Sequence, residues 1–184
     1  MNLLLYICGK ARTALRTQRY GVRCCCLCVA AVFLHGKTVN YFCCSVMKDK
    51  YTFCIEMKVR DYECDIQGVV NNANYQHYLE HARHEFLESI GGSFSHLHNQ
   101  GIDPMVSKIT LEYKRPLRGG DCFEVCINME RRGAKLVFLQ DIYNKTSGAL
   151  AVKGEVDVVC LKDGRLTRGE VFDEMFKDYF TNKN

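Results

Sequence analysis

The strongest constraint on the fold is a helical repeat of apolar side chains between residues 75 and 90. Apolar residues recur there at spacings of three and four, while charged and polar residues fill the other positions. Asparagines suited to capping precede the run, and two glycines that can end a helix follow it. Such a helix must bury one face against a broad partner. The apolar positions are Tyr75, Tyr78, Leu79, Ala82, Phe86 and Ile90.

Alternating apolar and polar residues before and after this run predict that the partner is a sheet. One alternating run precedes the helix and four follow it, separated by turns rich in glycine and polar residues. Successive hairpins favour antiparallel pairing. We therefore predict an α+β fold in which an antiparallel five-stranded sheet wraps around one long central helix. The predicted strands are 53–59, 109–113, 123–129, 136–143 and 150–160, and a short helix is expected over 172–179.

Composition divides the chain near Met47. Residues 1–46 carry six basic side chains, no acid and seven of the twelve cysteines, whereas the remainder has 19 basic and 21 acidic residues. We predict a non-domain extension over 1–46 and one domain over 47–184. The longest apolar run of the extension is too short to span a bilayer, and the order of its basic and apolar parts does not match a secretory signal.

Three explanations of the extension stay open. Translation that begins at Met47 is favoured, because the composition changes abruptly there. An organelle transit peptide is the second, since the segment is free of acids and carries arginine. The third is reversible palmitoylation of a cysteine cluster. This cluster comprises Cys24, Cys25, Cys26 and Cys28.

The five cysteines after Met47 show no spacing typical of a zinc site. We expect reduced thiols in a reducing compartment, which favours a cytoplasmic location unless the extension targets an organelle. The near-neutral domain has no basic stripe, so nucleic-acid binding is not expected. Stable membrane insertion is not expected either, because the hydrophobic fraction of 47% and the charged fraction of 25% lie in the range of soluble globular proteins. These cysteines are Cys54, Cys64, Cys122, Cys126 and Cys160.

Asp65 lies between the first predicted strand and the start of the long helix. Its carboxylate can there face the backbone N–H groups that a first helical turn leaves unpaired. Those N–H groups suit an oxyanion on a thioester carbonyl, while a carboxylate can activate water or attack directly. A lone aspartate at such a place is more often a cap or turn residue, and that alternative is retained.

Residues 59–75, followed by Tyr78, Glu80, Ala82 and Arg83, resemble the signature of hotdog thioesterases of the hydroxybenzoyl-CoA, acyl-CoA and acyl-ACP type. Residues 113–116 and Gly120-Asp121 resemble the family's later strand and turn, so that the likeness covers about 51–165. The resemblance implies a hotdog fold and cofactor-free hydrolysis of acyl-CoA or acyl-ACP. It also implies a homodimer or homotetramer with its active site at the subunit interface.

The resemblance assigns the catalytic carboxylate to Asp65, as base or nucleophile, and an oxyanion contact to the backbone N–H of Asn72. Some members carry His at the position of Asn72, and its absence here removes a His-assisted variant. The basic side chains at 114, 115 and 118 suit the phosphates of coenzyme A or phosphopantetheine. The substrate-binding residues expected are Gly68, Val69, Val70, Asn71, Asn74, Tyr75, Lys114, Arg115 and Arg118.

Other functions and sites were weighed against this prediction. A hotdog hydratase or dehydratase would place a histidine with the acid, and residues 65–75 contain none. A non-catalytic acyl-binding module would not need Asp65. No metal site is expected: His77, His81 and His84 share a helix face with acidic residues, and a solvated, salt-linked face is favoured over a metal site.

Overall fold

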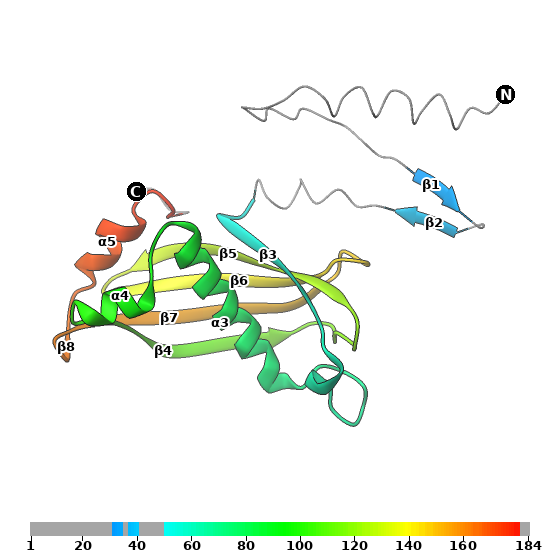
Figure 1. Cartoon of the computed structure of the whole chain (residues 1–184), viewed down its shortest axis with the longest axis horizontal. Helices are drawn as coiled ribbons and strands as arrows, with labels where there is room; N and C mark the ends of the chain where they lie inside the picture. The colour runs from blue at the N-terminus through cyan, green and yellow to red at the C-terminus, as the bar shows by residue number, and fades with distance from the viewer. Residues whose placement is uncertain (1–30, 35–36, 41–49, 181–184) are drawn as a thin grey trace, which may run out of the picture. The chain divides into compact units, whose positions relative to one another are not determined.

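The computed structural model divides the chain into two compact units, Met1–Cys43 and Cys44–Asn184. Within the first unit, β1 (Ala31–Leu34) pairs antiparallel with β2 (Lys37–Asn40). The residues described are 31–34, 37–40 and 50–180 (Figure 1). The boundary predicted at 46/47, the proposed start at Met47 and the cysteine cluster at 24–28 lie outside them.

One antiparallel sheet forms the base of the second unit. Its strands lie in the order β3-β5-β6-β7-β4, and the short strand β8 pairs with β7. Phe123, Val125 and Ile127 of β5 are fully buried in the hydrophobic core, as the alternation predicted, but Cys126 between them is fully buried too, so that burial in the central strands does not strictly alternate. The bounds are β3 (Phe53–Lys58), β4 (Ile102–Tyr113), β5 (Cys122–Arg132), β6 (Lys135–Asn144), β7 (Leu150–Lys162) and β8 (Arg165–Leu166).

The long helix α3 (Asn72–Ser89) lies across one face of this sheet (Figure 1). Gly154 of β7 allows the close approach, because a Cβ there would lie 2.9 Å from Cδ1 of Leu79 and 3.1 Å from the backbone oxygen of Gln140. The predicted α+β architecture is confirmed. No helix within the described residues is long and apolar enough to cross a bilayer.

Shorter elements depart from the predicted pattern. The strand expected from residue 109 begins at Ile102 and tolerates Pro104, because β4 is an edge strand of the sheet. A β-bulge between Val106 and Lys108 shifts its register. Two short helices were not predicted, and the closing helix begins two residues early. These are η1 (Asp61–Glu63), α4 (Phe94–Asn99) and α5 (Glu170–Phe176).

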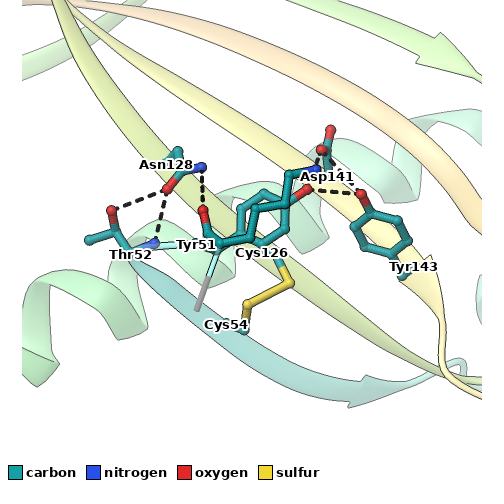
Figure 2. The surroundings of a disulfide bond; sticks show 8 residues. Tyr51, Thr52, Cys54, Cys126, Asn128, Asp141 and Tyr143 are labelled. Carbon is teal, nitrogen blue, oxygen red and sulfur yellow. Dashed lines mark hydrogen bonds between the residues drawn. A yellow bond between two sulfur atoms is a disulfide. The ribbon is translucent and has the colours of Figure 1, made fainter. Parts of the chain in front are cut away.

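The expectation of reduced thiols is wrong for Cys54 and Cys126, which form a disulfide between β3 and β5 (Figure 2). The two residues lie directly opposite each other in the antiparallel ladder, with Cα atoms 4.1 Å apart. The reason the sequence did not reveal the pair is that 72 residues separate them. Beside the disulfide, the hydroxyl of Tyr51 donates to Asp141 at 2.6 Å. Cys64, Cys122 and Cys160 are free thiols.

Candidate active site

A tight loop between η1 and α3 presents Asp65. Cys64 and Val70 form an isolated antiparallel bridge that closes the loop. Inside it, the N–H of Asp65 donates to Val69 at 2.8 Å and the N–H of Gly68 donates back to Asp65 at 2.9 Å. Gly68 has a φ of 71°, a backbone conformation that favours glycine. The position of the Asp65 backbone is therefore fixed by local hydrogen bonds.

The Asp65 carboxylate is held by its own loop. Its Oδ1 accepts hydrogen bonds from the N–H groups of Gln67, at 2.9 Å, and Val69, at 3.5 Å. We expected these donors to come from the first turn of α3, but Asn71 caps that turn by accepting from the N–H of Ala73 at 3.0 Å. Oδ2 of Asp65 accepts no hydrogen bond from the described residues. One oxygen is thus anchored and the other is available for chemistry.

Asn72, the first residue of α3, supplies an available backbone donor. Its N–H donates to no acceptor in the described part of the chain, while its carbonyl accepts from the hydroxyl of Tyr113 at 3.2 Å. The start of a helix carries partial positive charge, which favours a bound anion. A free carboxylate oxygen and an N–H suited to an oxyanion therefore occur close together.

A cavity of about 300 Å³ joins these groups. Residues of the loop, of the first turn of α3 and of the end of β4 form its walls. Most of the predicted site residues are among them, but Gly68, Asn71, Asn74 and Arg118 are not. The lining residues are Asp65, Val69, Val70, Asn72, Tyr75, Tyr113, Lys114, Arg115 and Pro116.

The four predicted residues outside the cavity support its walls. Asn71 caps α3, and the side-chain amide of Asn74 donates to the backbone carbonyl of Glu63 at 2.7 Å. Arg118 and Val69 form an isolated antiparallel β-bridge, and Gly68 lies in the turn of the Asp65 loop. None of the four lines this cavity, and contact of these residues with substrate stays a prediction.

Two cations lie on the rim of the cavity. The amino group of Lys114 forms an ion pair with Glu112 at 2.6 Å, and this contact lowers the pKa of the Glu112 carboxyl. The side chain of Arg115 forms no ion pair within the described residues. Arg115 is therefore the rim cation with its charge available to a phosphate group.

Sequence reasoning gave no site role to Tyr113, Glu63 or Tyr78, whose contacts shape the site. Tyr113 lines the cavity and contacts Asn72, although it was recognised only as a strand residue. Glu63, which is buried, accepts from Tyr78 at 2.8 Å. The acid at 63 and the tyrosine at 78 lie 15 positions apart, so that no local pattern joins them. The buried hydroxyl of Tyr75, which was predicted, accepts from the N–H of Leu117 at 3.0 Å.

The histidines of α3 lie away from Asp65. His81 Nε2 lies 3.8 Å from Oε1 of Glu85 one turn along the helix, a contact that is an ion pair when the imidazole is protonated, and the salt-linked face stays a prediction. The ring of His84 packs against Phe94, with centroids 4.4 Å apart. None of the residues lining the Asp65 cavity is a histidine.

Comparison with known proteins identifies the family to which this fold and the Asp65 loop belong. The model of the thioesterase-like superfamily matches residues 59–180, and the chain belongs to this family. The match begins at the end of β3 and includes the Asp65 loop and the rest of the sheet.

Individual relatives cover shorter stretches. An acyl-acyl carrier protein thioesterase of Arabidopsis thaliana, named as chloroplastic, is 44% identical over 84 residues, which are 46% of this chain and 44% of that protein. The acyl-CoA thioester hydrolase YbgC of Escherichia coli is 36% identical over 100 residues, or 54% of this chain and 74% of its own length. The chain thus matches less than half of the Arabidopsis relative.

Among solved structures, a protein of Aquifex aeolicus has a TM-score of 0.61 and 30% identity, covering 67% of this chain and 98% of its own. A thioesterase acting on DHNA-CoA from Staphylococcus aureus has a TM-score of 0.59 and 26% identity, covering 68% of this chain and 84% of its own. The hotdog fold predicted from the resemblance is therefore confirmed.

Proposed function

We propose that the protein hydrolyses acyl thioesters of coenzyme A or acyl carrier protein, with a fatty or related acyl group, and that Asp65 is its catalytic carboxylate. The observation that carries the proposal is the shared cavity: the free oxygen of Asp65 and the unpaired N–H of Asn72 both border it. The names of the Arabidopsis and Escherichia coli relatives support the same substrates.

The reaction follows from this pair of groups. The thioester carbonyl oxygen accepts a hydrogen bond from the Asn72 N–H, which stabilises negative charge as the carbonyl carbon is attacked. Asp65 either takes the proton of an attacking water or attacks the carbon itself to form an anhydride that water then cleaves. In both cases the C–S bond breaks, the thiolate leaves with a proton, and a carboxylic acid is released.

Arg115 and Lys114 would bind the phosphates of the thiol carrier at the rim of the cavity. The guanidinium of Arg115 is the stronger candidate, because Lys114 is already paired with Glu112. No histidine borders the cavity, which disfavours the hydratase alternative.

We further propose that two copies pair through β4 to form a homodimer, which could pair again into a tetramer. In the described sheet β4 pairs only with β7, and its other edge is open. Met105, Val106 and Ile109 on this strand are exposed apolar side chains, which an edge strand seldom leaves in water. Tyr113, the last residue of β4, lines the Asp65 cavity, so that the dimer interface would adjoin the site.

The test is thiol release from acyl-CoA and acyl-ACP substrates of graded chain length. Asp65→Asn keeps the size of the side chain and should lower kcat by about a hundred- to ten-thousand-fold, the range for loss of a general base. Asp178→Asn, at an exposed acid outside the cavity, should leave turnover unchanged. Wild-type protein that binds acyl ligands without releasing thiol would favour the non-catalytic acyl-binding module instead.

A further inference from the structure

A second cavity, of about 290 Å³, lies under the C-terminal half of α3. Residues of α3, α4, α5 and the sheet line it, and Figure 1 shows α4 and α5 at the same end of the sheet. It shares no lining residue with the Asp65 cavity. Asn72 and Arg83, one from each cavity, are separated by about 16 Å along the helix at 1.5 Å per residue. The two spaces are distinct.

The buried part of the lining is apolar apart from one cation, while Glu80 and His84, which also line the cavity, are exposed. Phe86, Leu97, Phe138 and Phe172 are buried apolar residues among its lining. Arg83 also lines it and is only 8% exposed. A charge in such surroundings is costly unless a partner of opposite sign compensates it.

No carboxylate of the described residues forms an ion pair with Arg83. Its Nη1 donates to the side-chain oxygen of Gln140 at 2.8 Å, and Gln140 is neutral and fully buried. Burial lowers the pKa of Arg83, and the acid Glu80 on the cavity wall opposes this only in part. The guanidinium thus remains a charged group held by a neutral amide.

The remaining nitrogens of Arg83 are accessible. Within the described part of the chain, every fully buried side-chain nitrogen or oxygen has a hydrogen-bond partner. The nitrogens of Arg83 that donate to no protein atom are therefore not sealed in the core. Arg83 lines the cavity, so that a ligand in this space would meet the guanidinium.

We propose that this cavity binds a monocarboxylate with an aliphatic or aromatic body, whose carboxylate pairs with Arg83. A guanidinium presents parallel N–H donors that match the two oxygens of a carboxylate. Arg83 is the one buried charge in the described lining, and a single buried cation balances a single negative charge, which favours a monocarboxylate over a doubly charged phosphate. The cavity holds about ten groups the size of a water molecule, each taking roughly 30 Å³, so that a body of about ten carbons fits it.

This ligand class includes the acid that hydrolysis of an acyl thioester releases. Only that relation to the product rests on the proposed function, because the binding itself depends on Arg83 and the apolar walls. The cavity would then hold product away from the Asp65 site.

The test is isothermal titration calorimetry of the full chain with sodium decanoate, below its micelle concentration and at pH 8, and with decanol as the uncharged match. We expect one decanoate per chain and at least tenfold weaker binding of decanol. Arg83→Gln, which removes the charge and keeps a polar side chain, should weaken decanoate binding about ten- to a hundredfold, since hydrogen bonds to charged groups are strong. Circular dichroism would establish that the variant is folded.

Two further variants test whether decanoate binds in this cavity or in the Asp65 cavity. Leu97→Phe fills the cavity without touching the charge and should also abolish binding, which keeps the test valid if Arg83→Gln does not fold. Asp65→Asn should bind decanoate as the wild type does, whether or not the protein is a thioesterase. The proposal is overturned if wild-type protein does not bind decanoate, if decanol binds equally well, or if Asp65→Asn alone removes binding.

Discussion

Tyr78 on α3 donates a hydrogen bond of 2.8 Å to the buried carboxylate of Glu63. The same carboxylate accepts from the N–H of Arg60 at 2.7 Å, and the backbone carbonyl of Glu63 accepts from Asn71 at 2.9 Å. Burial and the contact with Glu63 raise the pKa of Tyr78, so that its hydroxyl keeps its proton. Glu63 therefore fixes the segment before Asp65 to the helix that follows it.

Tyr78→Phe should destabilise the protein by about 1–3 kcal/mol, because it leaves a buried carboxylate with one donor fewer. Urea denaturation measures this loss. Thiol release should show a lower kcat with little change in KM, since the Asp65 loop would lose its fixed position. Tyr62→Phe, at a largely exposed tyrosine, is the control and should change stability by less than about 0.5 kcal/mol. Unchanged stability in Tyr78→Phe would contradict the role given to Glu63.

The contact between Arg131 and Asp173 predicts a stability difference that depends on pH. Two hydrogen bonds, of 2.7 and 3.1 Å, hold the pKa of Asp173 below its usual range. Ionised Asp173 therefore stabilises the fold above its unfolded pKa of about 3.9, and this contribution is lost as pH falls through the lower folded pKa. The carboxylate is half exposed, so that Asp173→Asn should cost less than about 1 kcal/mol at neutral pH.

Urea denaturation of wild type and Asp173→Asn at pH 7 and near pH 2 tests this dependence. The difference between the two proteins should be present at the higher pH and absent at the lower one. An equal difference at both values would show that the substitution acts through packing of α5 rather than through charge.

The disulfide predicts a loss of stability on reduction. Cys54 and Cys126 close a loop of 72 residues, for which the chain-entropy relation gives about 4 kcal/mol as an upper value. The double variant Cys54→Ser, Cys126→Ser should lose about 2–4 kcal/mol in urea denaturation. Cys122→Ser, at a free thiol of the same strand, is the matched control. Thiol counting on unfolded, unreduced protein would find both thiols if the bond does not form.

The open edge of β4 predicts that a charge there separates the proposed dimer. Ile109→Lys places an ammonium on the exposed apolar strip and should shift sedimentation toward the monomer at micromolar concentration. Leu166→Lys, at an exposed leucine of β8, should leave the assembly unchanged. A wild-type protein that sediments as a monomer would rule out the dimer directly.

Periodicity predicted the elements whose burial repeats over many residues. The helix at 75–90 and the run at 123–129 each have several apolar positions on one face, and both were located to within a few residues. α4 has only six residues, too few for a repeat to be recognised. The start of β4 was hidden because an edge strand needs no alternation and accepts Pro104.

In the candidate site, too, the sequence predicted some residues and missed contacts between distant ones. The place of Asp65 before the long helix followed from the local sequence, and Asn72 came from the family resemblance; both line the Asp65 cavity, and their catalytic roles stay predictions. Tyr113 reaches the site from β4, and Arg83 meets Gln140 from β6. These contacts join residues more than 40 positions apart, and depend on how α3 packs across the sheet.

The strand order has a consequence for synthesis of the chain. β4 ends at Tyr113, but its only partner in the described sheet, β7, begins at Leu150. On the ribosome, β4 therefore emerges without its partner strand and stays unpaired until β7 has been made, whereas α3 can pack against β3 and β5 before that. A nascent chain stopped after β6 would lack the strand that joins β4 to the sheet. Such truncated chains should be clients of chaperones and proteases, whereas translation as far as Lys162, the end of β7, would complete the ladder.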